Sequence, residues 1–161
     1  MPARAPTHYK INLKIQPEFQ RWVAGPALRS AARAALNHQS APAPAELSVR
    51  ITGDDDLRDL NREFLGQDEV TDVLSFPSEL TEPDTGRRYY GDIAISYPAA
   101  RRQARQAGHP VRAELQLLVV HGLLHLLGHD HARPEQKAQM WAAQAAILTK
   151  LKAGITGPAV D

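Results

Sequence analysis

Hydrophobic and polar residues alternate in several short segments of this chain, which is the pattern of β-strands that bury one face. The alternation is clearest in YKINLKI, where every second residue is apolar, and β-branched and aromatic residues mark the other segments. A proline ends the third segment, and a glycine in the fourth predicts a bulge or a turn. The predicted strands span residues 9–15, 47–52, 70–77 and 89–96.

Apolar residues recur at helical spacing in most of the remaining chain. The first helical segment is interrupted by Gly25-Pro26, which predicts a break or a fresh helix start. Gly66 and Gly108 are expected to stop helices, and Pro134 is expected to open the last one. The predicted helices span residues 17–38, 53–66, 98–107, 110–127 and 134 to about 151.

The order of these elements predicts the fold class. Strands and helices alternate at first, two strands then follow each other, and helices complete the chain of 161 residues. This order favours an α+β (mixed α/β) fold, with one small mixed β-sheet of about four strands packed with about five helices. We expect residues 1–153 to form a single domain and residues 154–161 to be a disordered tail.

Composition excludes several kinds of chemistry. The chain has no cysteine, so disulfides, thiolate metal ligands and thiol nucleophiles are excluded, and a metal would be held by nitrogen and oxygen. The net charge is +1, so affinity for nucleic acid would require a local basic patch. The N-terminus lacks the apolar segment of a secretory signal, and no apolar run approaches the ~18–20 residues of a membrane span. We therefore expect a cytoplasmic protein without a membrane partner.

Four histidines occur in HGLLHLLGHDH, residues 121–131, within an otherwise leucine-rich segment. His121 and His125 are four residues apart, so on a helix they point the same way and are about 6 Å apart along the axis. Two imidazoles in this arrangement can bind one metal ion, as they do in HExxH metalloenzymes. The isolated histidines are interpreted as ordinary surface residues. They are His8, His38 and His109.

A third ligand is expected after the end of this helix. Gly128 is a typical helix stop, and Asp130 and Pro134 also disfavour continuation. A turn at Gly128 would bring His131 back toward the first pair, whereas a continued helix would place His129 on the same face. We favour His131. Three neutral imidazoles with an open fourth position are typical of a catalytic Zn²⁺ site, here at the end of a core helix, although imidazole also binds nickel, copper and iron.

The position after His121 distinguishes this pattern from that of metalloproteases. HExxH proteases place a glutamate there as general base, but this chain has Gly122. Peptide hydrolysis by that route is therefore disfavoured. The nearest carboxylate is Asp130, which could act as a catalytic base, orient a ligand imidazole or only form a turn.

Three segments together resemble the YbeY family of bacterial metal-dependent endoribonucleases, which are also described as rRNA maturation factors. The segments are TDVLSFP at 71–77, GDIAIS at 91–96 and HGLLHLLGHDH at 121–131. The last fulfils HGxLHLxGxDH at every fixed position, and the resemblance covers about residues 45–150. It implies a small mixed sheet with a helical layer, one zinc ion held by His121, His125 and His131, and cleavage of single-stranded RNA.

The resemblance also implies a cellular role and shows one departure from the family. The implied role is 16S rRNA 3′-end maturation and ribosome quality control, with rRNA and the small ribosomal subunit as partners and DNA not expected. Many members carry an arginine where this chain has Leu65, and leucine cannot make a phosphate contact. Arg62, one turn earlier, is the candidate to replace that arginine.

The residues themselves support RNA binding only through short basic clusters. Three arginines precede the metal-binding helix and could contact phosphates, although a solvated helix face explains them slightly better. They are Arg101, Arg102 and Arg105. In TDVLSFP the apolar residues are interpreted as core, and Thr71, Asp72 and Ser75 are the ones that could line a cleft.

Two alternatives to the nuclease remain open. The first is a metalloprotease-like hydrolase, which the two-histidine helix supports and Gly122 opposes. The second is a non-catalytic ribosome-assembly factor stabilised by a metal. An open coordination position counts against it, because structural zinc sites usually have four protein ligands.

Overall fold

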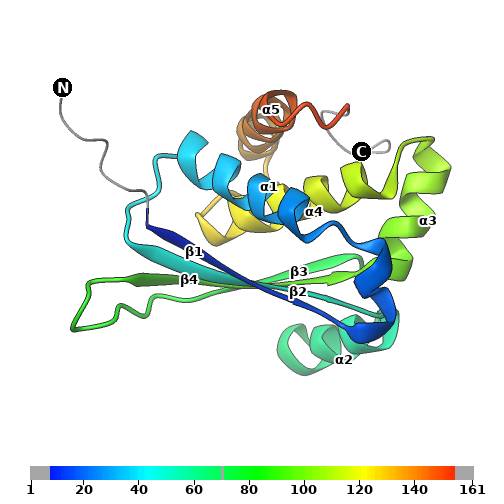
Figure 1. Ribbon diagram of the computed structural model, residues 1–161, viewed down its shortest axis with the longest axis horizontal. Helices are drawn as coiled ribbons and strands as arrows, with labels where there is room; N and C mark the ends of the chain where they lie inside the picture. The colour runs from blue at the N-terminus through cyan, green and yellow to red at the C-terminus, as the bar shows by residue number, and fades with distance from the viewer. Residues whose placement is uncertain (1–7, 70, 155–161) are drawn as a thin grey trace.

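A four-stranded β-sheet with the order β1-β2-β4-β3 organises the protein (Figure 1). The computed structural model describes residues 8–69 and 71–154. The elements in these ranges are β1 (Tyr9–Ile15), the 3-10 helix η1 (Pro17–Trp22), α1 (Gly25–His38), β2 (Ala45–Thr52), α2 (Asp54–Leu65), β3 (Val73–Pro77), β4 (Arg88–Ser96), α3 (Tyr97–Ala107), α4 (Val111–Leu126) and α5 (Pro134–Lys150). The predicted mixed α+β fold is confirmed. No helix in the described ranges combines the length and the apolar composition needed to cross a membrane.

The sheet is mixed, and its edge strand contributes to the site described below. β1 pairs in parallel with β2, and β2 pairs in parallel with β4, whereas β3 and β4 are antiparallel. The parallel pair β1–β2 is connected through η1 and α1, as parallel strands require a crossover. β3 lies at the edge of the sheet and contacts α4.

β4 bulges beside the glycine that the sequence pattern singled out. The register shifts between Glu46 and Leu47 of β2, which leaves Tyr90 as an extra residue in β4. Gly91 has a φ of 134°, and a Cβ atom there would lie 2.2 Å from the carbonyl oxygen of Phe76. Only glycine fits this position.

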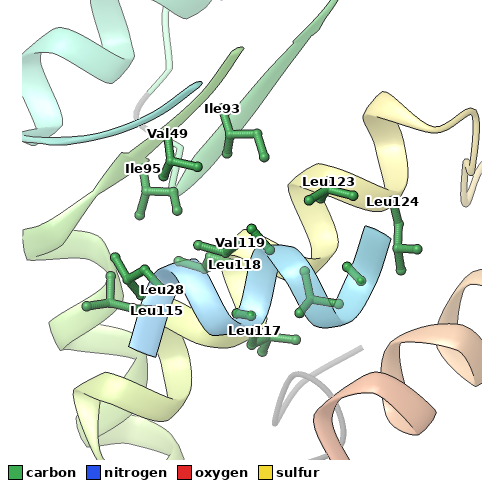
Figure 2. Close-up of a cluster of buried hydrophobic side chains, with 14 of the residues drawn as sticks. Leu28, Val49, Ile93, Ile95, Leu115, Leu117, Leu118, Val119, Leu123 and Leu124 are labelled. Carbon is green, nitrogen blue, oxygen red and sulfur yellow. The ribbon is translucent and has the colours of Figure 1, made fainter. Parts of the chain in front are cut away.

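Helix α4 is the centre of the helical layer. Figure 1 shows α1, α4 and α5 on one face of the sheet and α2 on the other. α4 is apolar on all sides, and most of its residues between Ala113 and Leu126 are buried. Its leucines and valines pack with Leu28 of α1 and with Val49 and Ile93 of the sheet (Figure 2). A helix packed on all sides is a rigid support for the side chains at its end.

Most predicted boundaries agree with the structure to within two residues. The interruption at Gly25-Pro26 separates η1 from α1. The third strand is an exception, because it begins at Val73. Asp72 lies in a bend before it, and its carbonyl accepts the N–H of Ser96 at 2.8 Å. The predicted disordered tail, 154–161, lies outside the described residues except for Gly154.

His109 is not an ordinary surface residue, and that prediction is wrong. Its side chain is 11% exposed, and its Nε2 lies 2.6 Å from Oε1 of Glu114. α3 ends at Ala107, and Gly108 after it adopts the left-handed conformation, a turn that brings His109 next to the first turn of α4. Burial raises the pKa of Glu114, and the hydrogen bond from His109 opposes this shift. His8 and His38 are exposed, as predicted.

Candidate metal centre

Three histidines meet where α4 ends. His121 and His125 lie one turn apart, and their rings are adjacent, as the spacing predicted. The helix ends at Leu126, and Gly128 adopts a φ of 99°, a conformation that favours glycine. The chain then turns back and places the ring of His131 beside the other two.

The three rings form a compact cluster. Their centroids are 4.8 Å apart for His121 and His125, 5.5 Å for His121 and His131, and 5.1 Å for His125 and His131. One nitrogen atom of each residue lies within 4.8 Å of the others. His129, the alternative third ligand, lies outside the cluster, and its Nε2 is 2.8 Å from Oε1 of Gln39. The structure therefore brings together the three histidines that the sequence favours.

Burial keeps two of these imidazoles neutral. It lowers the pKa of His121 to about 4, against the opposing effect of a hydrogen bond to Gln144. Burial also lowers the pKa of His125, and the neighbouring His131 adds to this shift. A neutral imidazole has a free lone pair, so both rings can accept a metal ion at neutral pH without first losing a proton.

The donor set fits a divalent transition-metal ion. Zinc binds imidazole nitrogen at about 2.0–2.1 Å, so two nitrogen ligands of a tetrahedral ion are about 3.3–3.4 Å apart. The three nitrogens lie within 4.8 Å of one another, so they would move closer together to hold one ion. Within the described residues the cluster has no fourth histidine or carboxylate, so a coordination position would stay open.

The cluster borders a pocket of about 400 Å³ whose other wall is β3 and the residues before it. This wall consists of Thr71, Asp72, Val73, Leu74, Ser75 and Pro77. The interpretation of TDVLSFP as mainly core therefore holds only in part. Leu74 and Phe76 belong to a small apolar cluster, while Thr71, Asp72 and Ser75 line the pocket. Alternate residues of a strand point to opposite faces, so one segment serves both purposes.

One hydrogen bond holds this wall against α4, and a second holds it against α3. Ser75 Oγ donates to the carbonyl of Gly122 at 3.0 Å, and Gln103 of α3 donates to Oδ2 of Asp72 at 2.9 Å. A Cβ atom at Gly122 would lie 2.9 Å from Cγ2 of Ile93 and 3.1 Å from Ser75 Oγ. The sheet therefore leaves no room for a side chain at the position where HExxH proteases carry glutamate.

A buried glutamine orients the ring of His121 through a hydrogen bond to its Nδ1 atom. Gln144 of α5 is fully buried, and its Oε1 lies 3.0 Å from Nδ1 of His121. An amide oxygen only accepts hydrogen bonds, so this contact places the proton on Nδ1 and leaves the Nε2 lone pair for a metal. Sequence reasoning missed Gln144, because no local pattern relates a glutamine 23 residues away to this histidine.

Replacing Gln144 by leucine is expected to weaken Zn²⁺ binding by about 10- to 100-fold, the usual effect of removing the partner of a ligand histidine. Leucine keeps most of the side-chain volume, so the core should remain packed. The Kd would be measured by competition with a chromophoric chelator. Gln139→Leu, at an exposed position of the same helix, is the matched control. Equal Kd values for the two variants would contradict the orienting role.

Asp130 makes a local contact. Its Oδ1 accepts the backbone N–H of His131 at 2.7 Å, and its side chain is exposed. It is not among the described residues that line the pocket. These observations favour the turn-forming interpretation of Asp130 over a role as catalytic base.

The four arginines predicted to contact RNA lie elsewhere, and the described residues that line this pocket include no arginine. Arg62 pairs with Asp59 at 2.8 Å on the exposed side of α2. Arg102 pairs with an aspartate at the start of α2 at 2.9 Å. Arg101 and Arg105 are exposed on α3. Any contact between these arginines and an RNA would therefore be made outside the metal pocket.

Comparison with known proteins reveals extensive similarity. The model of the family described as Endoribonuclease YbeY matches residues 12–152. An Endoribonuclease YbeY of Dehalococcoides mccartyi (strain CBDB1) is 39% identical over 157 residues, which cover 90% of this chain and 95% of the relative. One of Chloroflexus aggregans is 47% identical over 128 residues, or 75% of this chain and 83% of the relative. A Thermotoga maritima protein, whose structure was determined in solution, shares the fold with a TM-score of 0.56 and 24% sequence identity. The matched region covers 91% of this chain and 94% of that protein. The family match includes part of β1 and all of α1, which the three motifs did not cover.

Proposed function

This chain belongs to the Endoribonuclease YbeY family, and on that premise we propose that it is a metal-dependent endoribonuclease that cleaves single-stranded RNA. The observation that carries the proposal is the cluster of His121, His125 and His131 beside an open pocket. Family membership supplies the class of reaction. The cluster supplies a place in this chain where the reaction can occur.

The three histidines would hold the metal ion. We favour zinc, because the donors are three imidazole nitrogens and the chain has no cysteine. When bound, such an ion supplies Lewis-acid chemistry that activates water and polarises a phosphodiester. The histidines on α4 are fixed by the buried helix, and Gln144 holds His121 with Nε2 toward the ion.

The opposite wall of the pocket would recognise the ribose. The hydroxyl group of Ser75 donates its hydrogen bond to the carbonyl of Gly122, so toward a ligand its oxygen can only accept a hydrogen bond. The carboxylate of Asp72, held by Gln103, also accepts. Acceptors of this kind repel phosphate but suit the 2′-hydroxyl group, the donor that distinguishes RNA from DNA.

The finer role rests on the family resemblance. We place the substrate in ribosomal RNA, at the 3′ end of 16S rRNA, with the small ribosomal subunit as partner and ribosome quality control as a further role. That substrate would make the protein cytoplasmic. Leu65 is 53% exposed at the end of α2 and cannot contact phosphate, and Arg62 is already paired with Asp59. The phosphate contacts would therefore come from Arg62, whose exposed pair with Asp59 a phosphate can replace, or from other cations.

The geometry weakens both alternative functions. A protease of the HExxH type needs a glutamate where Gly122 lies against Ile93. A non-catalytic assembly factor with a structural metal would be expected to close the site with four protein ligands, whereas the described residues provide three.

The direct test is cleavage of a single-stranded RNA that contains the 3′ end of 16S rRNA by the purified, metal-loaded protein. We expect cleavage that a chelator stops and added Zn²⁺ restores, while a duplex of the same sequence stays intact. Unfolded casein is incubated in parallel. Intact RNA in the presence of protein that holds one metal ion per chain would refute the proposal, and cleavage of casein would favour the hydrolase.

A further inference from the structure

A second pocket, of about 300 Å³, lies between η1 and α3 and shares no lining residue with the metal pocket. Aromatic side chains form one part of its wall and arginines form the other. The residues concerned are Phe19, Trp22, Tyr97, Arg101, Arg102 and Arg105. The three arginines are among the four that the sequence suggested for RNA contact, whereas the aromatic residues had no such interpretation.

In the aromatic part of this wall, the rings of Phe19, Tyr97 and Trp22 pack in sequence, and Trp22 lies at the surface. Trp22 is 50% exposed, and its ring lies at 12° to that of Tyr97 with 6.0 Å between centroids. Tyr97 is buried and packs on Phe19 at 5.1 Å. The guanidinium of Arg21 lies 4.4 Å from the centre of the indole. This guanidinium lies over the ring and belongs to an exposed side chain, so a base would stack on the indole by displacing it. An exposed indole on a rigid base is a platform on which nucleic-acid bases stack.

The arginines give the pocket positive charge that is not neutralised by pairing. Arg21, Arg101 and Arg105 are exposed, and no carboxylate among the described residues lies within 4.0 Å of their guanidinium nitrogens. Arg102 differs, since it is bound by Asp54. Two guanidinium groups of the pocket, those of Arg101 and Arg105, are thus available to an anion, and that of Arg21 lies over the neighbouring indole. Guanidinium groups beside an aromatic surface complement a single strand, which presents phosphates and bases together.

Helix α3 connects this pocket to the metal centre. Gln103 bonds Asp72, which lines the metal pocket. Around a helix axis, Gln103 lies about 160–200° from Arg101 and Arg105, so these arginines project from the opposite side. A helix with its side chains is about 10–12 Å across. A ligand that occupies both pockets must therefore be an oligonucleotide and not a single nucleotide.

We propose that Trp22, Arg101 and Arg105 form a secondary binding site for single-stranded RNA, in which a base stacks on the indole and the guanidinium groups hold phosphates. The proposal rests on the proposed function, because the RNA held here is the strand that is cleaved at the metal centre. The site would supply phosphate contacts from two arginines of α3. It also predicts that the enzyme prefers substrates long enough to reach both pockets.

The test compares Trp22→Ala and the double variant Arg101→Ala/Arg105→Ala with wild type on two single-stranded RNAs, of about four and about twenty nucleotides. With the metal-loaded proteins and the long RNA, we expect KM to rise about five- to tenfold while kcat changes little. The short RNA should be cleaved equally by all proteins. Arg33→Ala, which removes an exposed charge from α1, is the matched control.

Salt dependence and direct binding separate this site from the catalytic one. Binding of the labelled long RNA is followed by fluorescence anisotropy after chelation, which stops cleavage. For the double variant, the slope of log K against log salt should fall by about 1.4, or 0.7 for each lost phosphate contact. If the wild-type protein binds the long RNA through these residues but cleaves neither RNA, the proposed function is refuted and the proposed binding site is retained.

Two results would overturn the proposal. Equal loss on short and long RNA would mean that the substitutions act on the metal centre or the fold. Unchanged affinity for the long RNA in both variants would mean that RNA is not the ligand of this pocket. A protein partner would then be the candidate ligand. Thermal unfolding identifies a destabilised Trp22→Ala, and the double variant, which changes only exposed side chains, then decides alone.

Discussion

Replacing His125 by alanine is expected to abolish metal binding at neutral pH and to lower RNA cleavage at least about a thousandfold. His125 supplies one of three nitrogens, and the two that remain cannot hold an ion as firmly. Metal assistance to a phosphodiester cleavage is worth several kcal/mol, and each 1.4 kcal/mol corresponds to a factor of ten in rate. Elemental analysis and a cleavage time course on the same samples measure both effects.

The control for this experiment is the histidine next to the site. His129 lies four residues further along, outside the cluster, and contacts Gln39. His129→Ala should lose about 1 kcal/mol of stability and keep both metal and activity. His131→Ala removes an exposed ligand and should resemble His125→Ala without any change to the core. Full activity of His125→Ala or His131→Ala would contradict the assignment of the metal centre.

Replacing Gly122 by alanine is expected to destabilise the protein by about 1–3 kcal/mol and to weaken metal binding. The new Cβ would lie 2.9 Å from Ile93, which is 1% exposed and cannot move aside, so α4 must shift away from the sheet. Both α4 ligands would move with it. In an open helix the same change would add up to about 1 kcal/mol of stability, so the sign of the effect is diagnostic.

Urea unfolding and zinc competition would measure these effects of Gly122→Ala. Gly53→Ala is the matched control, because nothing lies within 4 Å of its added Cβ atom. Gly53 is the N-cap of α2, where alanine is less favourable than glycine, so we expect a loss of up to about 1 kcal/mol of stability with metal affinity unaltered. If Gly122→Ala has the same stability and metal affinity as the wild-type protein, the close packing of α4 on β4 does not position the ligands.

Local patterns were sufficient to predict most elements and the grouping of the three histidines. The four-residue spacing of His121 and His125 determines their direction on any helix, and a glycine such as Gly128 ends a helix through its own backbone freedom. Both effects act within one or two turns of chain. The third histidine follows within three residues of that turn, so its approach to the pair was also a local property.

Contacts between distant segments were not predictable in this way. Gln144 reaches His121 from another helix, and Ser75 reaches Gly122 from the edge strand. Neither contact leaves a periodic trace in the sequence. His109 was misassigned for the same reason, since its isolation along the chain says nothing about the buried carboxylate of Glu114 that it meets.

The sequence by itself determined the helices and strands, the three histidines and the absence of a protease glutamate, because these depend on residue type and short-range spacing. Only the tertiary structure decided that β3 forms the second wall of the metal pocket. It alone also decided that the sheet packs closely against Gly122, and that Trp22 and the arginines of α3 line the same pocket. Strand order and helix packing bring these residues together across long stretches of chain. Such proximity follows from burying a common core, and no local pattern records it.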